Sequence, residues 1–113
     1  MTGRTFRRLA LSLEGAAEGA HMCHPDFRAH GRIFATLDAA EREGHVKLTP
    51  EQQAELMTSR PEVFAPASGA WGHQGWTRVH LQPADEEAIG EALTLAWRNV
   101  SAKRARTKRP SRG

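Results

Sequence analysis

Four short segments alternate apolar and polar side chains with a period of two, and this alternation constrains the fold more than any other feature of the sequence. The segments cover residues 27–30, 33–37, 45–48 and 76–81. Successive side chains of a β-strand point to opposite sides, so the alternation predicts strands that are buried on one face only. A further extended segment is expected over residues 18–23, which adds to a sheet that needs a core on one side.

Three helices are predicted to supply that core. The first covers residues 4–13, where apolar side chains recur at intervals of three and four. The second begins at a capping box formed by Thr49 and Gln52, with Pro50 in its first turn, and the third is capped by Asp85. This order of elements indicates an α+β domain with an antiparallel sheet and helices on one face.

The alternation divides the strand residues into two sets that face opposite sides of the sheet. The set expected in the core is Phe27, Ala29, Ile33, Ala35, Leu37, Val46, Leu48, Thr77, Val79 and Leu81. The set expected on the outer face is Arg28, His30, Phe34, Thr36, His45, Lys47, Trp76, Arg78 and His80. The outer set holds three fixed positive charges and no carboxylate, which favours a surface for a polyanion. The alternative is an ordinary solvated sheet face. A tight hairpin turn is expected at Gly31 and Arg32.

The charge of the chain is unevenly distributed along its length. Residues 102–113 contain six lysines and arginines and no acidic residue, whereas residues 1–101 contain 10 basic and 13 acidic groups. A run of cations cannot bury apolar surface, so we predict one folded domain over residues 1–101 and a disordered basic tail over residues 102–113. Such a tail is either an arm that binds nucleic acid without sequence preference or a solubilising end.

The segment HMCHPDFRAHGR, residues 21–32, contains three of the six histidines and the only cysteine. His21, Cys23, His24 and His30 lack the paired spacing of structural zinc sites. Cys23 has histidines nearby but no identifiable third group to orient one of them as a base. We therefore expect ordinary strand and turn residues here, with no metal, no cofactor and no catalytic residue.

Gly69, Gly72 and Gly75 recur at every third position beside Trp71 and Trp76. No Lys-Ser or Lys-Thr pair follows, so the pattern is neither a Walker loop nor a dinucleotide fingerprint. The glycines are expected to let bulky rings pack against nearby backbone, with both tryptophans as buried anchors. The alternative is that the tryptophans stack on nucleic-acid bases.

Two sequence blocks and the closing helix resemble one protein family. The blocks are HPDFRAHGRIFATL and PEVFAPASGAWGHQGWTRVHL, and the helix carries Trp97 and is followed by Lys103 and Arg104. In this order they resemble the MmcQ/YjbR family of small bacterial proteins, over residues 5–104.

The resemblance implies a helix, three strands, a helix, two strands and a helix, related to the secretion-chaperone-like fold. It places an additional strand near residues 63–66, with Phe64 pointing inward. It brings no catalytic motif. The family is commonly called DNA-binding because its sheet resembles a "double wing" used by a phage transcription factor, and such an analogy of fold implies a function without establishing it.

The leading hypothesis is a cytoplasmic, non-enzymatic protein that binds DNA weakly through the outer sheet face and the tail. The residues expected to contact nucleic acid are Arg28, Arg32, Lys47, Trp76, Arg78, His80, Lys103, Arg104 and Arg106. The alternative is a chaperone-like module that engages another protein through apolar surface around Phe64 and Trp71. No signal peptide or membrane-spanning segment is visible, and no heptad predicts a dimer, so we expect a monomer without membrane contact.

Overall fold

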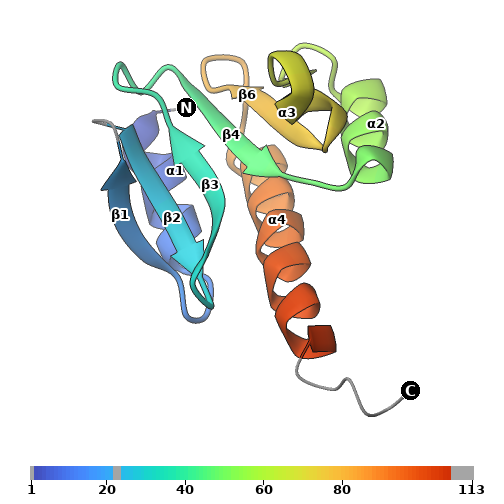
Figure 1. The fold of residues 1–113 in the computed structure, drawn as a ribbon. Helices are drawn as coiled ribbons and strands as arrows, with labels where there is room; N and C mark the ends of the chain where they lie inside the picture. Colours follow the sequence, from blue (N-terminus) through green and yellow to red (C-terminus); the bar gives the residue numbers. More distant parts are fainter. Residues whose placement is uncertain (1, 22–23, 108–113) are drawn as a thin grey trace.

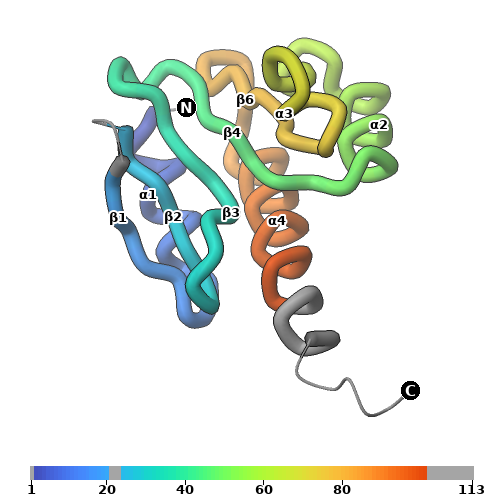
Figure 2. The backbone as a smooth tube through the Cα atoms, viewed as in Figure 1, coloured from blue at the N-terminus to red at the C-terminus, as the bar shows by residue number. Residues whose placement is uncertain are grey.

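The structure, a computed structural model, describes residues 2–21 and 24–107, and their side chains over residues 2–20 and 24–101. In chain order its elements are α1 (Gly3–Leu11), β1 (Ala17–His21), β2 (His24–Ala29), β3 (Arg32–Leu37), β4 (Glu43–Lys47), α2 (Pro50–Ser59), β5 (Phe64–Pro66), α3 (Gly69–His73), β6 (Trp76–His80) and α4 (Glu86–Thr107). Figures 1 and 2 show α4 passing behind β4, while α1 lies behind β1 and β2.

The described strands form one antiparallel sheet in the order β1-β2-β3-β4-β6-β5. The predicted α+β class is therefore confirmed, and so is the additional strand that the family resemblance placed near residues 63–66, where Phe64 is buried. Four strands precede α2, one more than the resemblance implied, because Glu43–Lys47 pairs with both β3 and β6.

The core lies between the sheet and the two helices α1 and α4. Phe6 of α1 contacts Phe27 of β2, with ring centroids 5.9 Å apart, and α4 packs along β2, β3 and β4. The indole of Trp97 on α4 donates a hydrogen bond of 2.7 Å to the carbonyl oxygen of Glu14. The sequence predicts helices on one face of the sheet only, and the short helix α3 differs from this. Its Trp71 contacts Trp76 on the outer face, opposite the core.

The predicted helix caps are confirmed by their hydrogen bonds. The backbone N–H of Gln52 donates to Thr49 Oγ1, and the backbone N–H of Thr49 donates to Gln52 Oε1, at 3.1 and 3.0 Å. The carboxylate of Asp85 accepts from the backbone N–H of Ala88 at 2.8 Å, and this hydrogen bond lowers the pKa of Asp85. Both helices thus begin where the sequence predicts, because a cap depends only on residues three positions apart.

The β2–β3 hairpin turns one residue earlier than predicted. Ala29 pairs with Arg32, so the two turn residues are His30 and Gly31, with φ of 56° and 76°. Two consecutive residues with positive φ are typical of a turn whose twist matches that of the strands. Arg32 is therefore the first residue of β3 instead of a turn residue.

A β-bulge in β3 overturns the predicted positions of Ile33 and Phe34. Phe27 pairs with Ala35 and Arg28 pairs with Ile33, so β3 carries one more residue than β2 between these pairs, and that residue is Phe34. A bulge shifts the alternation by one position. Phe34 is accordingly 0% exposed in the core, and the partly exposed Ile33 shares the outer face with Arg28.

The last helix extends past residue 101, the last residue of the predicted folded domain. The backbone of α4 continues to Thr107, so the segment expected to be disordered from residue 102 begins inside a helix. Alanine, lysine and arginine all have high helix propensity, which lets the helix extend beyond its apolar stripe. Residues 108–113 of the predicted tail lie outside the described residues.

The bulge predicts that Phe34 contributes more to stability than Ile33, whereas an uninterrupted alternation would predict the opposite order. Replacing Phe34 with Ala is expected to lower the free energy of unfolding by about 3–5 kcal/mol, because it leaves a cavity in the core. Replacing Ile33 with Ala is expected to cost less than about 2 kcal/mol, since that side chain is only partly buried. Urea denaturation monitored by circular dichroism measures both, with Phe34→Leu as a milder substitution if the alanine variant does not fold. An equal or larger loss for Ile33→Ala would contradict the bulge.

Candidate functional site

The sheet opens between β3 and β4 at the bulge, on the side of Arg32. Pairing between these strands covers Ala35↔Val46 to Leu37↔Gly44, and in this register Lys47 would next meet the bulged residue 34. Instead, the carbonyl oxygen of Lys47 accepts a hydrogen bond of 2.9 Å from the side-chain amide of Asn99 on α4. Asn99 thus takes a place that a neighbouring strand would occupy, and α4 contributes to the floor of the opening.

The opening is a cleft of about 950 Å³, which we call the cationic cleft. Its walls carry the three cations Arg28, Arg32 and Lys47 and the two indoles of Trp71 and Trp76. Among the lining residues that the structure describes there is no carboxylate. Four of the nine residues predicted to contact nucleic acid therefore lie together here. Positive charge around a concave surface raises the local concentration of anions.

Arg28 is held by a buried carboxylate. Its Nε and Nη2 atoms donate to Asp26 Oδ1 and Oδ2 at 2.9 and 3.1 Å, and these hydrogen bonds, together with the charge of Asp26, raise the pKa of Arg28. Asp26 is 0% exposed although it lies on the outer face, so its carboxylate needs this partner. Loss of Arg28 would consequently destabilise the fold as well as remove a charge from the cleft.

Arg32 and Lys47 line the cleft from the two strands between which the sheet opens, β3 and β4. Arg32 is exposed at the start of β3 and has no ion pair with any other described residue. The ammonium group of Lys47 lies 5.4 Å from the ring centroid of Trp76, within the range of a cation–π interaction. Both residues therefore belong to the lining of one cleft, Arg32 from β3 and Lys47 from β4.

Trp71 differs from the buried anchor that we predicted. Its side chain on α3 is 62% exposed, and its ring meets that of Trp76 edge to face, with centroids 6.2 Å apart at 79°. The ring also lines a smaller adjoining hollow of about 350 Å³ with Thr36 and His45. The sequence could not reveal this exposure, because the glycines around Trp71 were equally consistent with a packed ring.

The glycines have a backbone role instead of the predicted ring packing. A Cβ atom at Gly75 would collide with the carbonyl oxygen of Leu48, and the φ of Gly75 is 107°, a conformation that side chains disfavour. A Cβ at Gly72 would collide with the carbonyl oxygen of Ala67. Both glycines therefore allow α3, with its exposed tryptophan, to lie close to the backbone of neighbouring segments of the chain.

The outer face also carries carboxylates, which corrects the prediction that it has none. Besides Asp26, it holds Glu43, whose carboxylate lies 3.1 Å from His80 Nδ1 and 3.8 Å from Arg78 Nε. Along β4, Glu43 is roughly 13 Å from Lys47, so the acidic and the cationic ends of this strand are well separated. Arg78 and His80, although predicted to contact nucleic acid, thus lie toward the acidic end of the face.

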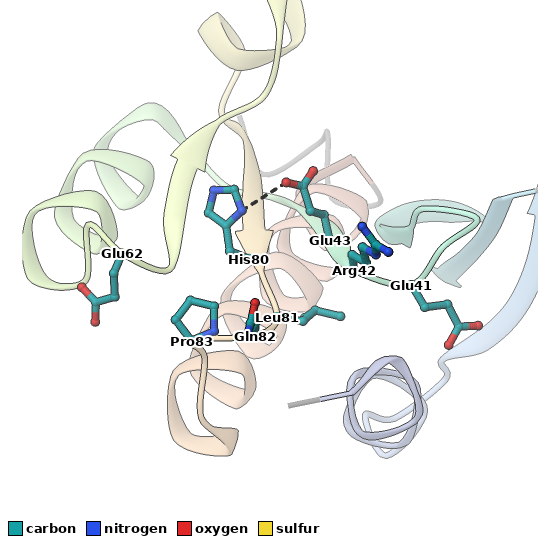
Figure 3. Close-up of a pocket in the computed structure, with 8 residues that line it drawn as sticks. All are labelled: Glu41, Arg42, Glu43, Glu62, His80, Leu81, Gln82 and Pro83. Atoms are coloured by element: carbon teal, nitrogen blue, oxygen red, sulfur yellow. Dashed lines mark ion pairs between the residues drawn. The ribbon is translucent and has the colours of Figure 1, made fainter.

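A second pocket of about 600 Å³ lies at that acidic end (Figure 3). Glu43 and His80 point toward one another in Figure 3, whereas the carboxylates of Glu41 and Glu62 point away from them. In the part of the chain that the structure describes, no three histidine, cysteine or acidic side chains are placed to hold a metal ion. Diverging carboxylates make this pocket unsuitable for a polyanion or for a single cation.

Some predicted residues lie outside the described side chains. Cys23 is not among the described residues, and the side chain of His21 is not described either, so the expectation that residues 21–32 hold no metal stays a prediction. The side chains of Lys103, Arg104 and Arg106 also lie outside the described side chains, so their contact with nucleic acid stays a prediction. These residues follow the cleft residues Asn99 and Val100 on α4.

The fold defines the class of small α+β domains in which an antiparallel sheet is backed by helices. Among the helices of residues 2–21 and 24–107, none combines the length and apolar character that a bilayer span requires. The chain belongs to the YjbR family, whose model matches residues 11–99.

A solved structure supports the fold. The crystal structure of protein DR2400 of Deinococcus radiodurans, with the family domain DUF419, superimposes with a TM-score of 0.72 at 22% identity, covering 85% of this chain and 75% of that one. At this identity the similarity concerns the fold. No curated protein matches the chain.

His45, at the centre of the outer face, makes a pH-dependent prediction. Partial burial and the positive charge of Arg78 lower its pKa below the usual 6.5, against the opposing charges of Glu43 and Asp38. Proton NMR titration is expected to give a pKa below 6.5 that rises in Arg78→Ala and stays unchanged in Arg4→Ala, a substitution on α1.

The same shift predicts how stability depends on pH. In the window between the lowered pKa and 6.5, the unfolded chain binds a proton that the folded protein does not, so stability decreases as the pH falls through this window. The free energy of unfolding of His45→Gln should fall less steeply there than that of the unchanged protein. Identical pH profiles would contradict the assignment.

Proposed function

We propose that this protein binds DNA through the cationic cleft and the basic segment that follows it, without catalysing a reaction. The observation that carries the proposal is the grouping of Arg28, Arg32 and Lys47 around one opening, with no carboxylate among the described residues that line it. The residues 1–101 as a whole are net negative, so this grouping runs against the average charge of the domain. Such segregation favours contact with a polyanion.

The basic C-terminal segment supports the same surface. Asn99 and Val100 line the cleft on α4, and Lys103, Arg104 and Arg106 follow within two helical turns of the same chain. We infer that these cations extend the positive region of the cleft along a nucleic-acid backbone. Contacts of this kind to phosphates would give weak binding with a strong salt dependence.

The acidic end of the outer face limits the proposed footprint. Glu43 lies beside Arg78 and His80, so a phosphate approaching these two residues would also approach a carboxylate. Arg32 and Lys47 are therefore the main phosphate contacts in this proposal. Arg28 can contribute those N–H donors that are not hydrogen-bonded to Asp26. Arg78 and His80 contribute less than the sequence pattern alone would imply.

The proposal predicts that Arg32→Ala weakens duplex binding and reduces its salt dependence. Each phosphate neutralised contributes about −0.9 to the slope of log affinity against log salt concentration, so the variant should have a slope less negative by about 0.9. Fluorescence anisotropy with a labelled duplex at several salt concentrations measures this. Arg4→Ala is the matched control, since Arg4 is also exposed but lies on α1 behind the sheet. Equal losses in both variants, or no binding at low salt, would contradict the proposal.

A further variant distinguishes the contribution of the folded domain to duplex binding from that of its basic C-terminal segment. Replacing Lys103, Arg104 and Arg106 with Gln removes three charges and preserves helix propensity, which a truncation at residue 101 would not do because α4 continues to Thr107. We expect reduced duplex affinity with a residual dependence on Arg32. If binding disappears completely, the cleft is not the nucleic-acid surface.

The exposed indole of Trp71 favours a protein-interaction module as the second candidate function. Together with Ile33 and Ala67 it forms an apolar border of the smaller hollow beside the cleft. Large exposed aromatic side chains are enriched at protein–protein contacts. Affinity purification with and without nuclease distinguishes the two functions, because a protein partner would be retained after the nucleic acid is digested.

A further inference from the structure

The exposed ring of Trp71 is the feature of the cleft that phosphate binding leaves unexplained. Its indole is 62% exposed, whereas the large apolar side chains of the core are buried. Gly72 and Gly75 allow α3 to lie close to neighbouring backbone, where a Cβ atom would collide. The side-chain amide of Gln53 also donates hydrogen bonds to the carbonyl oxygens of Gly72 and Trp76, at 3.1 and 3.0 Å. The ring is thus presented to the cleft by a tightly anchored helix.

The cleft combines this ring with cations in a way that suits a nucleotide. Lys47 and Arg32 lie among the lining residues that include the indoles of Trp71 and Trp76, and Lys47 already contacts the latter. An aromatic face stacks on a base of any identity, while cationic groups contact the phosphates next to that base. The volume of about 950 Å³ lies within the range of sites that enclose small organic groups.

A base that is stacked and paired inside a duplex cannot reach a ring in a concave site. Only an unpaired base can leave its neighbours and stack on such a side chain, whereas the phosphates of a duplex remain on its outside. We propose, building on the nucleic-acid function above, that the cationic cleft binds an unpaired base of a single strand, which stacks on Trp71 while its phosphates contact Arg32 and Lys47.

The direction of the strand follows from the charges on either side of the cleft. Toward the far end of β4 the outer face becomes acidic at Glu43, which repels phosphates. Toward α4 the sequence becomes basic after Val100. The bound strand therefore leaves the cleft along α4 and not along β4.

The experiment compares single strands with a duplex by using the full chain. Labelled oligothymidine of about 12 nucleotides, the oligouridine of equal length and a duplex of equal length are titrated at low salt by fluorescence anisotropy. We expect the single strands to bind more tightly than the duplex. Trp71→Ala should weaken single-strand binding about 5- to 150-fold, the range for loss of one base–aromatic stack, and change duplex binding less than about twofold.

Two further variants make the result specific for stacking. Trp71→Phe preserves an aromatic ring and should recover most of the single-strand affinity. Leu11→Ala removes the other large exposed apolar side chain of the described residues, which lies on α1, and should change neither affinity. Tight binding of either single strand counts in favour of the proposal.

The outcomes separate this inference from the function on which it rests. If the duplex binds as tightly as the single strands, or if Trp71→Ala affects neither or both equally, the single-strand inference is wrong and the DNA-binding function stands. If neither single strands nor duplex bind at low salt, both are wrong.

Discussion

The extra residue that β3 carries at Phe34 determines where the sheet opens and which side chains surround the opening. With Phe34 in the core, Ile33 turns to the outer face, and pairing between β3 and β4 is limited to three residue pairs. Bulges commonly re-aim side chains and end pairing next to functional sites. In this protein the bulge places Arg32 at one side of an opening and Lys47 at the other, with Asn99 hydrogen-bonded to the carbonyl oxygen of Lys47.

The sequence predicts those features that depend on neighbouring residues. The caps at Thr49 and Asp85 are correct because each is a contact over three positions. The positions of Ile33 and Phe34 could not be derived in this way. Both residues are apolar, and which of them enters the core depends on the register against β2 and on the packing of the helices behind the sheet.

The candidate site was accessible to sequence analysis only in part. Arg28, Lys47 and Trp76 were identified from alternation and charge, and Arg32 from its charge beside the predicted hairpin turn. All four line one cleft. Asn99 was missed because its role arises from a hydrogen bond to a residue 52 positions away. Glu43 lies two residues before the strand predicted over residues 45–48, so the acidic end of the outer face is evident only from the structure, in which β4 begins at this residue.

The limited pairing between β3 and β4 has a mechanical consequence. It divides the sheet into β1-β2-β3 on one side and β4-β6-β5 on the other, and α4 packs behind strands of both halves. Ala35↔Val46, Thr36↔His45 and Leu37↔Gly44 are the only rungs that join the halves within the described sheet. Any widening of the cleft must therefore rotate one half of the sheet against the other about these three residue pairs. The helix α4 would keep the two halves connected during such a rotation, because it contacts strands of both.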